Sequence, residues 1–448
     1  MNIKKFFDES LSHLSYAVES KNKIVVVDPG RNPAPYLKFS KEKNATIDKI
    51  ILTHTHADFV GSHLELKNKT GADILCHPES KATFEHISFQ DKDQVKIGAV
   101  NFLAYDTPGH SRDSISVLIS DENGKQYGVF TGDTLFVGDV GRPDIPVSSD
   151  STEDDHYALK DDLSRRMYDS IRRVFYHLDE NVLIFPTHSG GSLCGSNISE
   201  EKESTLKKEL DENWALQTLS QDEFVDQLLN NQPHVPAYFI FDRQVNRNGA
   251  EDYQVSLGKI PKLESHSKID SDIVTVDVRP SDEYQKNHLR NSINLMLEEG
   301  FETWLGTFVK PHQSFYLTAN TRERLDQAAE KICKIGYEDF VEGSFLYKLQ
   351  GEKNGHSLDQ KDFKDHSENY TILDVRSSKE RDEQPIFNDA LQVPLNELPA
   401  KAENLHLEKP VVVHCSGGYR SAIATSILLK ERPELEVFDL GEEINQYK

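Results

Sequence analysis

Histidine and aspartate residues end four apolar stretches in the first half of this 448-residue chain. The first stretch is "ILTHTHADFVGSH" (51–63), in which such residues follow directly after a strongly apolar run. Across the four stretches the residues are His54, His56, Asp58, His110, Asp133 and His188. Imidazole and carboxylate groups that meet above the edge of a rigid sheet bind zinc or iron. The spacing therefore predicts a metal site in the first half of the chain.

A cysteine in a glycine-containing loop marks a second candidate site near the other end of the chain. In "VVVHCSGGYRSAIA" (411–424) a predicted strand leads into Cys415, and a predicted helix follows the loop. The loop residues are Ser416, Gly417, Gly418, Tyr419 and Arg420. Backbone N–H groups of such a loop point at the sulfur and favour a thiolate or a cysteine persulfide. An arginine after the cysteine is also typical of tyrosine and dual-specificity phosphatases, where it grips phosphate.

The elements that must position the metal site follow from the alternation of apolar runs and turns. Seven strands are expected, at 23–30, 49–54, 72–78, 101–110, 114–120, 127–133 and 182–188. Apolar residues at helical spacing predict an amphipathic helix over 159–178, and a charged helical stretch follows over 200–231. Strands covered by helices predict a layered domain. The segment "HVPAYFIFDRQVNRNGAEDY" (234–253) is expected to be an irregular connector.

The second half of the chain contains an internal repeat. Residues 273–295 match 370–395, each with a strand, an Asp-Val-Arg triplet and a later apolar strand, and 313–337 then match 410–434. The sequence therefore predicts two copies of one small strand–helix domain.

The two predicted copies differ at the cysteine position. Ala319 stands there in the first copy, so this copy cannot carry sulfur and is expected to be a spacer or a docking platform. Arg324 aligns with Arg420 and is expected to be a surface or interface charge, whereas Cys333 is expected in the core. The pairs Asp277/Arg279 and Asp374/Arg376 are expected to be structural ion pairs.

Composition narrows the partners. The formal net charge is −24, from 51 Lys and Arg against 75 Asp and Glu, which disfavours nucleic acid and anionic membranes. No run approaches 18 apolar residues, and the first 20 residues lack the apolar core of a signal peptide. The four cysteines are scattered and give no disulfide framework. We therefore expect a cytoplasmic protein with reduced cysteines.

On these motifs, the first 235 or so residues resemble the metallo-β-lactamase superfamily, in its glyoxalase II and persulfide dioxygenase branch. The usual pattern there is H-x-H-x-D-H, and Phe59 replaces its last histidine here. Around Cys415 the chain resembles rhodanese sulfurtransferases. The whole order resembles persulfide dioxygenase–sulfurtransferase fusions of the CstB type.

The resemblance implies an α/β and α+β multidomain protein, an αββα metallo-β-lactamase sandwich followed by two α/β rhodanese-like domains. The implied domains are a dioxygenase domain at 1–235, a connector at 236–262, a cysteine-less rhodanese-like domain at 263–350 and an active rhodanese at 360–448.

The resemblance also implies one Fe(II) per chain, held by His54, His110 and Asp133 as a two-histidine, one-carboxylate face that leaves open positions. His56, Asp58 and His188 would lie around these ligands or touch the metal. Zinc bound by three histidines (His54, His56 and His110) stays open as the alternative cofactor.

The implied substrates are a low-molecular-weight thiol persulfide, O₂ and sulfite, with sulfite or thiosulfate as product and sulfide detoxification as the role. Cys415 and Arg420 would be catalytic, and residues 416–419 would bind substrate. Arg142 would hold a substrate carboxylate or phosphate, or else form a salt bridge within its loop. Cys194, in a Gly- and Ser-rich loop expected to be accessible, would handle persulfide or merely pack.

Two rival functions remain at this point. One is a zinc thioester hydrolase of the glyoxalase II kind, against which Phe59 and the rhodanese fusion weigh. The other is a non-enzymatic sulfur-relay scaffold in which only Cys415 matters. Self-association is expected from the related enzymes, and the identity of the carrier thiol is not encoded in any motif.

Overall fold

The computed structural model describes residues 1–145, 153–230, 232–264, 269–298, 300–348 and 358–448. The chain divides into two compact units, residues 1–256 with 333–336, and 257–332 with 337–448. In the described part of the chain, no helix is long and apolar enough to cross a lipid bilayer.

The first unit is built on two six-stranded sheets. The first sheet holds β1 (Asn2–Asp8), β2 (His13–Ser20), β3 (Lys23–Val27), β4 (Thr46–Ile51), β5 (Asp73–Cys76) and β6 (Ile87–Ser88), side by side in that order. The second has the order β12 (Ser204–Thr205), β11 (Leu183–Pro186), β10 (Gln126–Gly132), β9 (Ile115–Ser120), β8 (Val100–Asp106) and β7 (Gln94–Ile97). All seven predicted strands are therefore present, whereas β1, β2, β6, β7 and β12 were not predicted.

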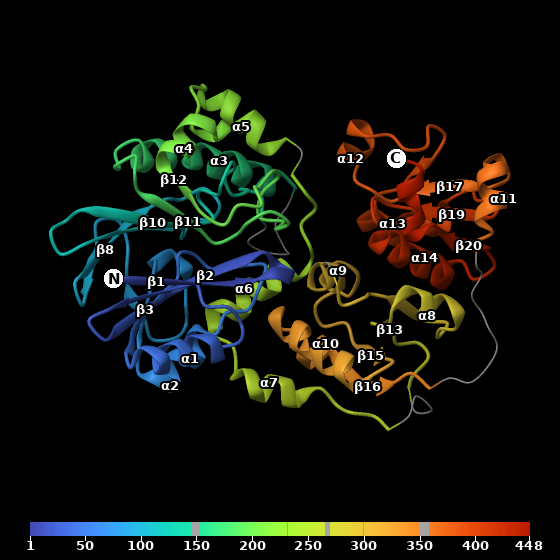
Figure 1. The fold of residues 1–448 in the computed structure, drawn as a ribbon, viewed down its shortest axis with the longest axis horizontal. Helices are drawn as coiled ribbons and strands as arrows, with labels where there is room; N and C mark the ends of the chain where they lie inside the picture. The colour runs from blue at the N-terminus through green and yellow to red at the C-terminus, as the bar shows by residue number, and fades with distance from the viewer. Residues whose placement is uncertain (146–152, 231, 265–268, 299, 349–357) are drawn as a thin grey trace. The chain divides into compact units, whose positions relative to one another are not determined.

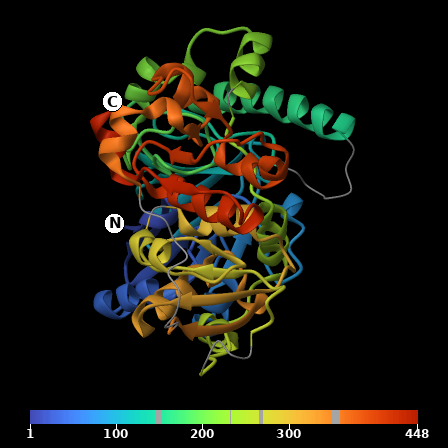
Figure 2. The ribbon, with the colours of Figure 1, turned by 90° about the vertical axis from the view of Figure 1, so that its right-hand side faces the viewer.

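Helices cover the outer face of each sheet (Figure 1). On the first sheet lie α1 (Ala34–Lys43) and α2 (His63–Thr70); on the second lie α3 (Glu153–Phe175), α4 (Leu206–Glu212) and α5 (Gln221–Leu229). Figure 2 shows α3 as one unbroken helix, which agrees with the helix predicted over 159–178. The unit is thus an αββα sandwich, as predicted.

Alternation along the strands explains the layers. In β3, Val25 and Val27 face the core between the sheets, and Ile24 and Val26 face the helices of the first sheet. A strand with apolar side chains on both faces must be covered on both, because successive side chains point in opposite directions. In the second sheet, Leu118 and Val129 likewise face outward, where Met167 of α3 covers them.

The predicted connector is largely helical. Residues 238–248 form α6 (Tyr238–Asn248), and α7 (Tyr253–Lys259) follows. The prediction of irregular backbone over 234–253 is therefore wrong. The buried residues of α6 recur at helical spacing, but several of them are polar (Asp242, Arg243 and Asn246), so a count of apolar residues alone misses the helix.

The second unit holds the two predicted copies, each with a four-stranded parallel sheet. The first copy contains β13 (Thr275–Asp277), α8 (Ser281–Lys286), β14 (Ser292–Asn294), α9 (Phe301–Phe308), β15 (Phe315–Ala319), α10 (Arg322–Lys334) and β16 (Val341–Leu346). The second contains α11 (Gln360–Asp365), β17 (Thr371–Asp374), α12 (Ser378–Glu383), β18 (Leu391–Gln392), α13 (Leu398–Lys401), β19 (Val411–His414), α14 (Tyr419–Glu431) and β20 (Val437–Asp439).

Candidate metal centre and sulfur-transfer loop

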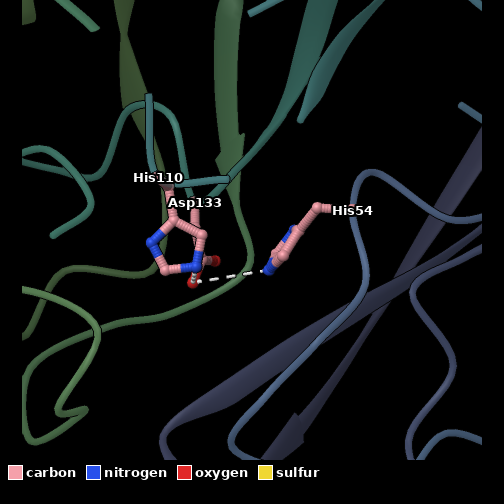
Figure 3. A group of neighbouring side chains, drawn as sticks. All are labelled: His54, His110 and Asp133. Atoms are coloured by element: carbon pink, nitrogen blue, oxygen red, sulfur yellow. Dashed lines mark ion pairs between the residues drawn. The ribbon is translucent and has the colours of Figure 1, made fainter. Parts of the chain in front are cut away.

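Three of the predicted ligands converge at the ends of strands from both sheets of the first unit. His54 follows β4, His110 lies in the loop between β8 and β9, and Asp133 follows β10 (Figure 3). Asp133 Oδ2 lies 3.7 Å from His54 Nε2 and 3.5 Å from His110 Nε2. The ligand atoms of the three residues all lie within 4.8 Å of one another. The structure thus brings together the two-histidine, one-carboxylate set.

Neighbouring groups orient the two histidines. His110 Nδ1 donates to the carbonyl oxygen of Arg142 at 2.8 Å, and His54 Nδ1 lies 3.1 Å from Thr53 Oγ1. Both contacts use the nitrogen that faces away from Asp133, so each Nε2 is available to a metal. Burial lowers the pKa of His110, and burial with the neighbouring histidines lowers the pKa of His54 well below its ordinary value. Neutral imidazole is the form that binds metal.

The donor set fits a metal ion on its own evidence. His54 Nε2 and both carboxylate oxygens of Asp133 are buried and have no hydrogen-bond partner among the residues that the structure describes. Unpaired buried polar atoms cost free energy, and a bound cation is the usual partner for such a cluster.

A second group lies beside the first. Asp58, His188 and Cys194 also place their ligand atoms within 4.8 Å of one another. His188 Nε2 lies 3.2 Å from Asp58 Oδ2 and 3.8 Å from Asp133 Oδ2. Asp58 and His188 had been predicted near the site, but a thiol among them had not been predicted as a ligand. The group supplies N, O and S donors of the kind that hold zinc.

Cys194 is buried, with 1% of its surface exposed, so the prediction of an accessible thiol is wrong. The Gly- and Ser-rich loop folds inward because Asp139 accepts from the backbone N–H groups of Ser196 and Asn197, at 3.0 and 2.7 Å. Burial and the carboxylates of Asp58 and Asp133 raise the pKa of Cys194 well above its ordinary value. Without a metal this thiol is held protonated.

Phe59 fills the space next to this second group. Its ring lies 3.9 Å from that of His13 and 4.5 Å from that of His56, measured between centroids, and its side chain is fully buried. His13 was not among the predicted site residues. It enters the site because it forms an isolated β-bridge with His188, a pairing that no spacing rule exposes.

Asp28 is a second residue that sequence reasoning missed. Its carboxylate accepts from the backbone N–H and the hydroxyl of Thr53, both at 2.8 Å, and lies 3.1 Å from His56 Nε2. Its φ of 49° is in the left-handed region, which a non-glycine residue occupies at some cost and commonly at a functional site. Asp28 therefore orients the ring of His56. The nearby carboxylates raise the pKa of His56, although burial opposes this effect.

Two further contacts hold the metal-binding loop in place. Asp113 accepts from Thr55 N at 2.8 Å and from Thr55 Oγ1 at 2.6 Å. Asn246 of α6 donates to the carbonyl oxygens of His56 and Phe59, at 2.9 and 2.6 Å. Helix α6 is thus part of the support of the metal-binding loop.

Arg142 stabilises the loop in which it lies. Its guanidinium forms a bidentate pair with Asp144, at 2.6 and 2.9 Å, and donates to carbonyl oxygens of Leu193, Pro233 and His234. Its side chain is 1% exposed. This arrangement is the loop salt bridge that the sequence left open as the alternative to a substrate contact. Through its carbonyl oxygen, Arg142 orients His110.

A pocket lies beside the metal-binding loop. Its lining includes His54, His56, Cys76, His77 and Arg247. Arg247 is half-buried, and in the described part of the chain its Nε has no hydrogen-bond partner. The pocket therefore offers a cationic group to a ligand that reaches the metal ligands.

In the second unit, the loop after β19 surrounds the sulfur of Cys415 as predicted from its glycines. The backbone N–H groups of Gly418 and Gly417 donate to Cys415 Sγ at 3.1 and 3.5 Å. Gly418 has a φ of 104°, which only glycine adopts readily, and α14 begins at the next residue. Cys415 is buried, whereas Ser416 and Gly417 are exposed, so the loop faces solvent next to the sulfur.

Arg420 is held by an acidic partner. Its guanidinium forms a bidentate pair with Glu380 at 2.7 and 2.6 Å and donates to Ser416 Oγ at 2.8 Å. Burial opposes the effect, but Arg420 and the contacts of Ser377 lower the pKa of Glu380 to about 2. An anion at this loop would meet an arginine whose charge is already balanced. Tyr419 turns away, and its hydroxyl donates to the carbonyl oxygen of Met296 at 3.0 Å.

Comparison with known families agrees with this geometry. Residues 10–188 match the model of the metallo-beta-lactamase superfamily, and residues 262–345 and 359–446 each match the rhodanese-like domain. The chain is a metallo-β-lactamase-fold domain followed by two rhodanese-like domains. This confirms the predicted fold class.

Individual relatives cover parts of the chain. A probable hydroxyacylglutathione hydrolase of Schizosaccharomyces pombe is 32% identical over 174 residues, which are 38% of this chain and 60% of that protein. A hydroxyacylglutathione hydrolase of Idiomarina loihiensis is 30% identical over 28% of this chain and 48% of its own length. The chain thus spans about half of these relatives.

Among solved structures, a metallo-beta-lactamase from Staphylococcus aureus subsp. aureus COL superposes with a TM-score of 0.69 at 27% identity, over 78% of this chain and 99% of that one. The similarity therefore extends well beyond the first unit. ETHE1 from Myxococcus xanthus matches with a TM-score of 0.46 at 25% identity, over 55% of this chain and 98% of that one.

Proposed function

We propose that the chain is an Fe(II)-dependent persulfide dioxygenase joined to a rhodanese-type sulfurtransferase. The observation that carries the proposal is that one chain contains two sites suited to sulfur chemistry. One is a two-histidine, one-carboxylate cluster beside Phe59; the other is a cysteine whose sulfur accepts two backbone N–H bonds. The first suits O₂ chemistry at one iron and the second suits bound sulfane sulfur.

His54, His110 and Asp133 would hold the metal. Fe(II) bound there would supply the activation of O₂ towards a sulfur substrate. The protein keeps both histidines neutral and oriented through Thr53 and the Arg142 carbonyl oxygen. Phe59 presents carbon where a further nitrogen ligand would otherwise stand. The pocket beside His54 would receive the remainder of the thiol, with Arg247 available to an acidic group on it.

The overall oxidation balances as thiol persulfide plus O₂ plus water giving thiol, sulfite and two protons. The outer sulfur is oxidised and O₂ is reduced, and the bond between the two sulfurs breaks. Sulfite is a nucleophile that cleaves sulfur–sulfur bonds, so its release calls for a sulfane-sulfur acceptor reaction.

Cys415 would provide that reaction. Attack of sulfite on the outer sulfur of a Cys415 persulfide forms thiosulfate and breaks the bond to Sγ, and the thiolate leaves into the N–H groups of Gly417 and Gly418. The sulfur is buried but its loop is open at Ser416, which gives a small dianion an approach.

Metal analysis and O₂ uptake test the first half of the proposal. Purified protein should contain close to one iron per chain and consume O₂ when given a thiol persulfide. His54→Ala, His110→Ala or Asp133→Ala should each remove both properties, whereas the exposed His177→Ala should remove neither. Two zinc ions per chain with no O₂ uptake would refute it.

Product analysis tests the second half. The wild-type protein should convert a thiol persulfide and O₂ mainly to thiosulfate, and Cys415→Ser should shift the product to sulfite without loss of O₂ uptake. Cys194→Ser should slow the reaction, because Cys194 lies among groups beside the metal ligands. Wild-type thiosulfate yield from both variants, after correction for the spontaneous reaction, would show that the two sites are not coupled.

A second candidate function is a two-metal thioester hydrolase. The group of Asp58, His188 and Cys194 favours it, since it could replace the histidine lost at Phe59, and relatives carry the name hydroxyacylglutathione hydrolase. Zinc-loaded protein would then hydrolyse a glutathione thioester, and Cys194→Ala would lower zinc content from two to one per chain. No hydrolysis at either zinc content excludes this candidate.

A further inference from the structure

The cysteine-less copy touches the Cys415 loop at its outer side. Tyr419 is the first residue of α14 and follows Gly418, whose N–H donates to the sulfur. The Tyr419 hydroxyl reaches out of its own domain and donates to the carbonyl oxygen of Met296, in the first copy. The start of α14 is therefore tied to the neighbouring domain one residue after a group that binds the sulfur.

The same copy also reaches the Cys415 loop through Asp439 of the second copy. Gln285 of α8 donates to Asp439 Oδ2 at 3.2 Å, and Asp439 Oδ1 accepts from Gly441 N at 2.9 Å. Gly441 in turn packs against Gly418 so closely that a side-chain carbon on Gly418 would lie 3.0 Å from the Gly441 carbonyl carbon. Gln285 is thus linked to the backbone at Gly418 through the carboxylate of Asp439 and the backbone at Gly441.

A third contact fixes the helix itself. Asn294 N, on the edge strand β14 of the first copy, donates to Ser426 Oγ of α14 at 2.9 Å. Both residues are buried, and Asn294 is further held by its side chain, which donates to the carbonyl oxygens of Asp277 and Arg279. Helix α14 therefore lies against the edge of the first copy's sheet.

The position that corresponds to Tyr419 differs in the first copy. In the register that sets Ala319 opposite Cys415, Glu323 stands opposite Tyr419. A carboxylate there cannot donate to a carbonyl oxygen. The first copy therefore supplies acceptors and amides to the second copy's loop, and its own corresponding position has no hydroxyl to offer in return.

We propose that the cysteine-less copy is the positioning half of the sulfurtransferase site, and that Tyr419 and Gln285 are positioning residues that hold the Cys415 loop from two sides. The inference rests on the proposed sulfurtransferase function. The N–H groups of Gly417 and Gly418 stabilise a sulfur anion only while they point at it. Two anchors on a separate rigid domain restrict the loop more than its own glycine-containing backbone does. The loss of its cysteine leaves the first copy with this structural role.

Two conservative variants test the proposal in the full chain. Tyr419→Phe removes one hydroxyl, and Gln285→Ala removes one amide. Each should lower kcat for sulfur transfer from thiosulfate to cyanide about three- to tenfold, the ratio that one ordinary hydrogen bond represents, with little change in KM. The pH profile for alkylation of Cys415 by iodoacetamide, followed on its peptide by mass spectrometry, should move to higher pH, because N–H groups that no longer point at the sulfur stabilise its anion less.

Matched controls separate positioning from simple stability. Tyr370→Phe removes a hydroxyl that binds Asp362 in the same domain, and Gln327→Ala removes an exposed amide on α10 of the first copy. Both should keep wild-type kcat and the wild-type alkylation profile. If Tyr419→Phe or Gln285→Ala lowers the melting temperature, the alkylation profile taken well below that temperature still reports the loop.

The outcomes are distinct from those of the proposed function. Wild-type kcat and an unshifted alkylation profile in both variants, alongside an inactive Cys415→Ser, would overturn the positioning role and leave the sulfurtransferase standing. Sulfur transfer retained in Cys415→Ser would overturn the sulfurtransferase function itself. An equal loss in Tyr370→Phe would also overturn the inference, because it would trace the effect to stability.

Discussion

The two rhodanese-like copies share a framework and differ in what the framework holds. Their sheets have equivalent strand orders, β14-β13-β15-β16 and β18-β17-β19-β20. Each copy has a buried ion pair at the end of an equivalent strand, β13 in the first copy and β17 in the second. Arg279 lies 2.7 Å from Asp277, and Arg376 lies 2.6 Å from Asp374. The predicted structural pairs are therefore present in both. A domain of this kind retains its fold after its nucleophile is gone.

The difference extends beyond the missing thiol. After Ala319, the side chain of Asn320 donates to Glu283 at 2.7 Å, and Thr321 Oγ1 accepts from Arg324 N at 3.2 Å. The second copy has small residues at the corresponding positions and turns its backbone N–H groups to the sulfur instead. In the first copy, side chains form the hydrogen bonds of this turn. The first copy therefore differs from the second in its loop as well as in its missing cysteine.

Moving the cysteine tests this comparison with the largest effect. Cys415→Ser should reduce sulfur transfer to background, because no other residue at the loop can hold sulfane sulfur. Adding Ala319→Cys to that variant should not restore transfer, since Thr321 and Arg322 stand where Gly417 and Gly418 donate to the sulfur. Cyanide-dependent thiocyanate formation measures both. Recovery of transfer in the double variant would show that the fold alone makes the site.

Breaking the shared framework should destabilise both copies alike. Asp374→Asn and Asp277→Asn each leave a buried guanidinium without its carboxylate, at a cost of roughly 3 kcal/mol in the free energy of unfolding. Urea unfolding of the full chain measures the loss. The exposed pair of Arg381 and Asp382 is the control, and Asp382→Asn should cost less than about 1 kcal/mol. A large loss in one copy only would show that the frameworks are not equivalent.

Corresponding arginines should differ in their effect on activity. Arg420→Lys loses the bidentate pair with Glu380 beside the sulfur and should lower sulfur transfer by about tenfold. Arg324→Lys loses contacts with Glu298 and the carbonyl oxygen of Val278 and should leave transfer unchanged. Steady-state rates at saturating thiosulfate measure both. Equal effects would contradict the assignment of chemistry to one copy.

The smallest expected effect concerns pH. Burial raises the pKa of Asp439 from 3.8 to about 6, so the folded chain keeps a proton that the unfolded chain releases between these values. This contribution therefore lowers stability as pH rises from about 4 to about 6 and is constant above that. Asp439→Asn should gain stability relative to wild type across this interval, as measured by urea unfolding at pH 4.5 and 7. A constant difference would contradict the raised pKa.

Much of the fold was predictable because its signals are local. Seven strands and helix α3 follow from apolar periodicity, and the internal repeat locates both copies. The hairpin of β1 and β2 was missed although Leu14, Tyr16 and Val18 alternate along β2 and enter the core. That signal was present, and period-two counting over the N-terminal residues would have found it.

The candidate site was less predictable where it depends on pairing between distant segments. His54, His110 and Asp133 follow strands and so could be grouped by rule. His13 and Asp28 join the site only through the bridge to His188 and through a left-handed backbone turn, which sequence spacing does not encode. The depth of Cys194 depends on Asp139, fifty-odd positions earlier in the chain, which draws its loop inward.

The two hydrogen bonds from Asn246 have a practical consequence for where the first domain can be cut. A fragment that ends at residue 235 would lack α6 and would leave the carbonyl oxygens of His56 and Phe59 without their donors. Both lie in the buried loop that carries the metal ligand His54, so the truncated fragment would misplace that ligand even though every predicted ligand is still present. The independently expressible metal-binding fragment must therefore extend through residue 248 at least, about a dozen residues past the sequence-derived boundary.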